Sequence, residues 1–152
     1  MSEPVRIALI GMGWWGKKML AVLQAAPGDI RVVRAVEPNM ESVADLCAER
    51  GVALSADYAD ALNDPSVEAV VLATPHDLHG AQIEAAVAAG KHVFCEKPLA
   101  LTKVGAETAV ALSQAGALGV LHSEGVWCRH EDPATSLAEI AAVDPDNPGA
   151  AG

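Results

Sequence analysis

The residues best suited to chemistry form a glycine-rich turn near the amino end of the chain. Gly11, Gly13 and Gly16 follow an apolar, β-forming run, and a helical pattern begins directly after them. In such a turn the first glycine permits a tight bend, the second lets the backbone approach a pyrophosphate, and the third lets helix and strand come close. The positive end of the helix dipole then favours phosphate. We therefore expect this turn, Met12 included, to bind a dinucleotide.

An acidic residue stands where a dinucleotide site needs one. Glu37 ends a second expected strand, about 20 residues beyond the turn, and can accept hydrogen bonds from an adenosine ribose. A carboxylate there repels a 2′-phosphate, and no arginine follows at once, so the sequence favours NAD over NADP as the cofactor. Ordinary turn glycines and a surface glutamate would explain the same residues, but strand, turn, helix and acid all occur in order.

Two tryptophans, Trp14 and Trp15, fill the gap between the second and third glycines. They fall in the first turn of the expected helix, beside the phosphate site. One of them could line the cofactor crevice while the other packs on the sheet. Packing residues at both positions are the alternative, and for at least one tryptophan packing is the favoured interpretation.

Polar residues also gather at the ends of the expected fourth and fifth strands. Because ligands of an open α/β sheet bind outside the carboxyl ends of its strands, we expect both groups at the cofactor. A lysine at this edge could hold a substrate oxygen or help to move a proton. From spacing alone, a solvated loop lysine is an equally good explanation. The two groups are Thr74, Pro75, His76 and His79 after the fourth strand, and Glu96, Lys97 and Pro98 after the fifth.

Alternating strand and helix patterns predict the elements that position these residues. They indicate an α/β fold, a doubly wound parallel sheet of the Rossmann type in the order 3-2-1-4-5-6. Asn39 and Thr102 are the expected N-caps of two helices, and Gly51 is an expected C-terminal stop. The expected strands are 5–11, 30–37, 51–54, 67–75, 92–96 and 117–123, and the expected helices are 13–25, 39–50, 58–64, 77–89 and 102–114.

Composition narrows the class of protein. The chain has 152 residues, 51% of them hydrophobic, and a formal net charge of -10, which argues against a nucleic-acid or anionic-membrane partner. No apolar run approaches the roughly 18 residues of a membrane span, and the amino end lacks a basic signal region. We therefore expect a soluble, cytoplasmic protein. Cys47, Cys95 and Cys128 lack metal-ligand spacing, so we expect idle thiols and no metal site.

Three segments together, GMGWWG, ATPHDLHG and CEKPLALT, resemble the glucose-fructose oxidoreductase / inositol dehydrogenase family of NAD(P)-dependent oxidoreductases. The resemblance covers roughly residues 5–123 and implies a Rossmann domain with a bound dinucleotide. It also implies that Thr74, Pro75 and His79 lie along the nicotinamide half of that cofactor.

The resemblance further implies that Glu96, Lys97 and Pro98 form the family signature, often with a cis bond before the proline. In that family the lysine assists binding and catalysis near the nicotinamide, so Lys97 is the one residue carried over as catalytic. His122 and His130 do not match the family pattern and receive no role.

Members of that family usually carry a second α/β domain that supplies the substrate pocket, and we expect that domain to be absent here. The expected division is a dinucleotide-binding domain over 1–123, a linker and helix over 124–143, and a disordered tail over 144–152. The helix at 133–143 and the open sheet edge lack their usual cover. We therefore expect a homo-oligomer or a partner chain.

Two functions from different classes remain open. The first is the cofactor domain of a sugar or polyol dehydrogenase, with hydride transfer between nicotinamide and a carbinol carbon and Lys97 near the substrate oxygen. The second is a non-catalytic NAD-binding module or a truncated remnant. A doubly wound domain for another nucleotide or coenzyme is a third possibility, against which Glu37 and the lysine motif both argue.

Overall fold

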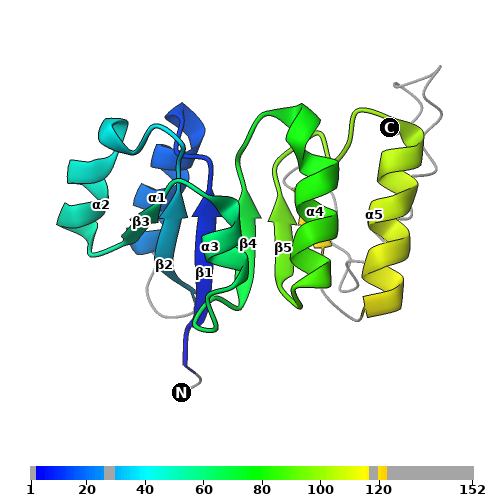
Figure 1. Ribbon diagram of the computed structural model, residues 1–152, viewed down its shortest axis with the longest axis horizontal. Helices are drawn as coiled ribbons and strands as arrows, with labels where there is room; N and C mark the ends of the chain where they lie inside the picture. The colour runs from blue at the N-terminus through cyan, green and yellow to red at the C-terminus, as the bar shows by residue number, and fades with distance from the viewer. Residues whose placement is uncertain (1–2, 26–29, 117–119, 123–152) are drawn as a thin grey trace.

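A parallel sheet of six strands forms the centre of the computed structural model, which describes residues 3–25, 30–116 and 120–122. The strand order is β3-β2-β1-β4-β5-β6, and all paired strands are parallel (Figure 1). The predicted doubly wound order is therefore confirmed. The strands are β1 (Val5–Ile10), β2 (Ile30–Val36), β3 (Ala53–Ser55), β4 (Ala69–Leu72), β5 (His92–Cys95) and β6 (Val120–His122).

Helices cover both faces of this sheet. In the view of Figure 1, α1 and α2 lie behind the sheet, and α3, α4 and α5 lie in front of it. The helices are α1 (Trp14–Ala25), α2 (Ala44–Arg50), α3 (Tyr58–Leu62), α4 (His79–Ala88) and α5 (Lys103–Gly116), with short 3-10 turns η1 (Met40–Ser42) and η2 (His76–Leu78). The expected helix at 133–143 and the expected tail lie outside the described residues.

Strand β1 shows why the central strands read as unbroken apolar runs. Ile7 and Leu9 belong to the hydrophobic cluster that includes residues of α1 and α2. Ala8 and Ile10 alternate with them and belong to the cluster on the α3, α4 and α5 side. Side chains of a strand point to opposite faces in turn, so a strand covered on both sides needs apolar residues at every position.

The helix ends agree with the sequence at two positions and differ at a third. Gly51 ends α2 with a φ of 65°, and the Thr102 hydroxyl oxygen accepts a hydrogen bond from the Gly105 backbone N–H at 3.1 Å. The prediction that Asn39 caps a helix is wrong, because its side chain makes no capping bond and α2 begins only at Ala44. The Asn39 backbone N–H donates to the Glu37 carboxylate, and the turn η1 lies between Asn39 and the start of α2.

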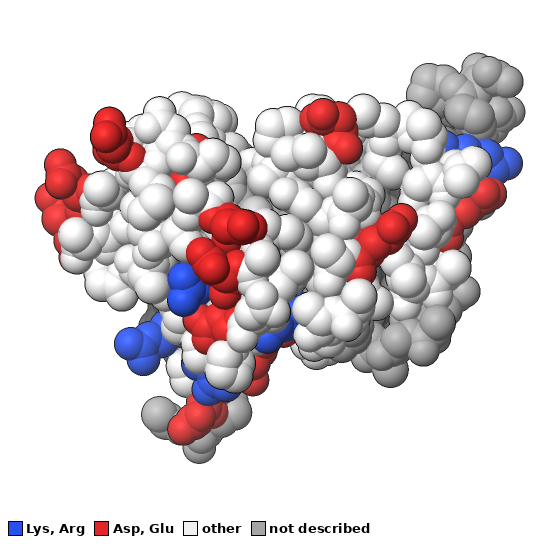
Figure 2. Space-filling model, viewed as in Figure 1, with Lys and Arg blue, Asp and Glu red and all other residues white. Residues whose placement is uncertain are grey.

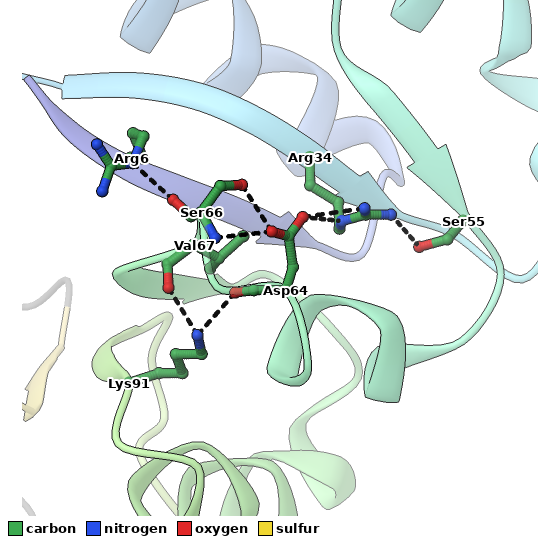
Figure 3. A network of polar contacts seen from close by, with 7 residues as sticks. All are labelled: Arg6, Arg34, Ser55, Asp64, Ser66, Val67 and Lys91. Atoms are coloured by element: carbon green, nitrogen blue, oxygen red, sulfur yellow. Dashed lines mark hydrogen bonds and ion pairs between the residues drawn. The ribbon is translucent and has the colours of Figure 1, made fainter.

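A polar network that the sequence did not reveal joins strands at the amino edge of the sheet (Figure 3). Asp64 accepts hydrogen bonds from the Ser66 backbone N–H and hydroxyl at 2.8 and 2.6 Å, and from the Arg34 guanidinium at 3.0 and 3.1 Å. The buried Lys91 ammonium donates to the carbonyl oxygens of Asp64 and Val67 at 2.8 and 2.7 Å. Hydrogen bonds from Ser66, with a smaller contribution from Arg34, lower the pKa of Asp64 to about 2. In Figure 2, acidic and basic side chains accordingly lie side by side in the lower part of the face shown.

We predict that Asp64→Asn lowers the free energy of unfolding by roughly 1 to 2 kcal/mol near neutral pH, allowing for solvent screening of the ion pair. The pKa of Asp64 is lower in the folded protein than in the unfolded chain. Its contribution is therefore complete above about pH 4 and is lost as the pH falls toward about 2. Urea unfolding of the wild type and the variant across that range measures this loss.

Glu84→Gln, the same acid-to-amide change at an exposed position of α4, is the control and should stay within about 0.5 kcal/mol of the wild type. A difference between wild type and Asp64→Asn that stays constant down to about pH 2 would contradict the role given to the Asp64 carboxylate.

Candidate functional site

The turn between β1 and α1 leaves no room for side chains at two of its glycines. A Cβ atom on Gly16 would lie 2.0 Å from the Gly11 carbonyl oxygen. Gly11 itself has a φ of 89°, and a Cβ atom there would lie 2.7 Å from the Ala73 carbonyl oxygen. Both obstacles are backbone atoms, so only glycine fits at either position. This close contact holds the first turn of α1 against the carboxyl end of β1.

Gly13 differs from these two glycines. It is exposed, and a Cβ atom built on it would meet no other atom within 4 Å. The fold therefore does not need glycine at this position, whereas a ligand that approaches the backbone would. The first helical hydrogen bond of α1 runs from the Lys17 N–H to the Gly13 carbonyl oxygen at 3.0 Å. The N–H groups of residues 14–16 precede it and have no partner within the helix, which makes them donors for a phosphate.

The acid after β2 contacts the glycine turn directly. One oxygen of the Glu37 carboxylate accepts the Met12 backbone N–H at 2.9 Å, and the other accepts the Asn39 backbone N–H at 3.0 Å. The Gly11 N–H donates to the Val36 carbonyl oxygen at 2.9 Å, which brings the two loops together. Each carboxylate oxygen has two lone-pair sites, so Glu37 retains capacity to accept ribose hydroxyls. Met12 buries its side chain and offers its backbone to this contact.

Neither tryptophan packs on the sheet, so that interpretation is wrong. Trp14 and Trp15 are 71% and 45% exposed, and their rings stack with centroids 5.7 Å apart. The Lys18 ammonium lies 4.5 Å from the centroid of the Trp14 ring. The buried residues of α1 are Gly16 and Leu20, and the two exposed indoles lie at the start of the helix, where its unpaired N–H groups are.

The loop after β4 is tied to α4 through both the side chain and the backbone of Thr74. The Thr74 hydroxyl donates to the Gln82 side-chain oxygen, and the Thr74 carbonyl oxygen lies 3.0 Å from His79 Nε2. Pro75 and His76, which follow in the same loop, are exposed. These two residues are therefore accessible to a ligand at the carboxyl edge.

His79 is fully buried, and its ring lies between two loops. Its Nδ1 atom is 2.7 Å from the Pro98 carbonyl oxygen, and its Nε2 atom faces Thr74 as described above. The sequence placed His79 among the cofactor-binding residues. This geometry does not support a direct contact between the ring and a cofactor, because protein atoms occupy both ring nitrogens. The burial of His79 and its partners had no signal in the sequence.

The signature after β5 adopts the backbone form that the resemblance implies, with a cis peptide bond between Lys97 and Pro98. Lys97 is exposed at this edge, whereas Glu96 and Pro98 are half-buried. The Glu96 N–H donates to the Leu72 carbonyl oxygen at 2.9 Å, which continues the pairing of β4 and β5 up to the lysine. The neighbouring Cys95 is buried, and burial raises the pKa of its thiol to about 12, so it is not a nucleophile at neutral pH.

Within the described residues, no group of three or more histidine, cysteine, aspartate or glutamate side chains could hold a metal ion. Over the same ranges, no helix has both the length and the apolar character needed to cross a membrane.

Comparison with known proteins supports the assignment of the fold and the family. Residues 5–121 match the model of an oxidoreductase family with an NAD-binding Rossmann fold. The chain is 36% identical over 138 residues to 1,5-anhydro-D-fructose reductase of Ensifer adhaerens, covering 88% of this chain and 41% of that protein. It is 38% identical over 100 residues to inositol 2-dehydrogenase 1 of Saccharopolyspora erythraea, covering 64% of this chain and 30% of that protein.

A solved structure of scyllo-inositol dehydrogenase from Lactobacillus casei, with bound NAD(H) and scyllo-inositol, superposes with a TM-score of 0.74 at 26% identity. It matches 80% of this chain and 36% of that chain. The chain thus spans about two fifths or less of the length of the relatives it matches. By the family model and by its own fold, it belongs to the glucose-fructose oxidoreductase / inositol dehydrogenase family, as an NAD-binding Rossmann domain of oxidoreductases.

Proposed function

We propose that the carboxyl edge of the sheet binds NAD and serves an oxidoreductase of the sugar or polyol dehydrogenase type. The contact between the Glu37 carboxylate and the Met12 N–H is the observation that carries this proposal. It fixes an acid with spare acceptor capacity beside a turn whose exposed glycine leaves space for a ligand. The names of the relatives, a reductase and inositol dehydrogenases, support the substrate class.

The residues of this edge fit the parts of a dinucleotide in the order of the strands. The N–H groups at the start of α1 would bind the pyrophosphate, and Gly13 would allow its approach. Glu37, after β2, would accept hydrogen bonds from the adenosine ribose. The loops after β4 and β5 lie on the other side of β1 and would contact the nicotinamide half.

The chemistry follows from what lies at the nicotinamide end. Bound nicotinamide supplies an acceptor for the hydride that leaves a carbinol carbon, or a donor for the reverse reaction. Lys97, exposed after β5, would hold the substrate oxygen by the charge of its ammonium or, as a neutral amine, would take the hydroxyl proton as the carbon–oxygen bond becomes a carbonyl. A non-catalytic NAD-binding module would bind NAD in the same way and would differ only in lacking turnover.

We predict that the protein binds NADH at least about tenfold more tightly than NADPH, because the Glu37 carboxylate repels a 2′-phosphate. Trp14 and Trp15 are exposed beside the site, so quenching of their fluorescence during titration reports binding of either cofactor. Glu37→Gln keeps the size of the side chain and removes its charge. This variant should show a smaller difference in affinity between NADH and NADPH than the wild type does. Equal affinity of the wild type for NADH and NADPH would be incompatible with this role of Glu37.

We predict that Gly13→Val weakens NADH binding by about 30-fold or more while the melting temperature changes little. The added side chain enters open space in the protein but occupies the path of the pyrophosphate. Ala21→Val adds bulk at an exposed position of the same helix and should leave both properties unchanged. In contrast, Gly16→Ala should destabilise the fold itself, because its methyl group collides with the Gly11 carbonyl oxygen. Normal NADH binding by Gly13→Val would rule out the assigned pyrophosphate position.

We predict that Lys97→Ala keeps the affinity for NADH within about threefold of the wild type and abolishes any dehydrogenase turnover. The reason is that the amine acts on the substrate oxygen rather than on the cofactor. NADH titration and a spectrophotometric screen of polyols and sugars with NAD provide the two readouts. Lys103→Ala, at an exposed lysine of α5, is the matched control. Turnover by Lys97→Ala at the wild-type rate would remove Lys97 from the mechanism.

A further inference from the structure

We propose that His79 is a positioning residue that sets the spacing between the loops after β4 and β5, and through them the fit of the nicotinamide half of NAD. The inference rests on the proposed function and assigns to a buried side chain a part in the selectivity of that site. It departs from the sequence prediction, which placed His79 in direct contact with the cofactor.

The ring of His79 is the link between these two loops. Its Nε2 atom lies 3.0 Å from the Thr74 carbonyl oxygen, and its Nδ1 atom lies 2.7 Å from the Pro98 carbonyl oxygen. The two nitrogens are fixed in one rigid ring, so the distance between the two carbonyl groups is fixed as well. The Thr74 loop has a second tie to α4 through the Gln82 side chain. Loss of the His79 ring should therefore release the Lys97–Pro98 segment more than the Thr74 segment.

Both partners of His79 are carbonyl oxygens, which only accept hydrogen bonds. Which nitrogen donates depends on the tautomer of the ring, and a neutral ring donates one of the two hydrogen bonds. The ring is also fully buried, so its loss removes the side chain that now contacts both carbonyl groups in the interior. No other natural side chain places two nitrogens in a small rigid ring, and a glutamine, with a single amide nitrogen, cannot span the same two carbonyl groups.

The strand order directs the effect to the nicotinamide half. Glu37 follows β2 and the glycine turn follows β1. In the proposed site, the adenosine and the pyrophosphate therefore bind at the ends of these two strands. The strands β4 and β5 come next in the order, beyond β1. Because a dinucleotide lies across the carboxyl ends of the strands, its remaining half meets the two loops that His79 joins.

The test compares NADH with ADP-ribose, which keeps the adenosine, pyrophosphate and second ribose but lacks nicotinamide. Calorimetric titration of the complete chain should show that His79→Gln weakens NADH binding about tenfold and changes the affinity for ADP-ribose less than about twofold. His92→Gln makes the same change at an exposed histidine at the amino end of β5 and should leave both affinities unchanged. A purely structural role of His79 would weaken both ligands alike.

Equal losses for the two ligands, or no loss for either, would overturn the proposal while leaving the NAD site in place. Failure of the wild type to bind either ligand would instead overturn the proposed function, and this inference with it. A measurement on the wild type keeps the claim testable if His79→Gln does not fold. Nitrogen-15 NMR of the histidine rings should show one ring with an N–H proton that exchanges slowly with water. A His79 ring whose N–H protons all exchange rapidly with water would contradict the link.

Discussion

The close approach of Gly16 to the Gly11 carbonyl oxygen is the contact on which the proposed cofactor site depends. That oxygen occupies the place where any other residue at position 16 would have its Cβ atom. The approach brings the first turn of α1 directly over the end of β1, so its free N–H groups face the same space as Gly13. Trp14 and Trp15 lie exposed on this turn, whereas Gly16 and Leu20 are the buried residues of α1. The position of the donor-lined turn thus depends on one missing side chain.

From this turn, contacts run across the carboxyl edge in the order of the strands rather than in the order of the sequence. The Glu37 carboxylate ties the loop after β2 to the turn through the Met12 N–H. Gly11 lies against the backbone of Ala73, at the start of the loop after β4. His79 then joins that loop to Pro98, after β5. Each loop is held by its neighbour in the sheet, so the groups that would meet a dinucleotide are positioned before it binds.

The sequence predicted the features that depend on local pattern. The strand order, the glycine turn, the Gly51 stop and the Thr102 cap all follow from periodicity or from the chemistry of single residues. The Asn39 cap failed because a 3-10 turn follows Asn39 in place of the expected helix, and the Asn39 side chain makes no capping bond there. The expectation that a tryptophan packs on the sheet failed because helical periodicity alone does not say which face of the first turn is inward.

Two other features had no signal in the sequence because they depend on contacts between distant residues. The Asp64 network draws together residues from β2, from the turn before β4 and from the position just before β5. The partners of His79 are backbone carbonyl oxygens, which every residue carries and which no motif can identify. The central claim is that a dinucleotide lies along the glycine turn with its ribose on Glu37, and amide NMR of the nitrogen-15-labelled chain during addition of NAD tests it most directly. The account predicts saturable shifts of the amides of Met12, Trp14 and Trp15, while those of Ser66 and Val67 at the opposite edge stay in place. Shifts confined to the opposite edge, or no shifts in the turn at saturating NAD, would contradict it.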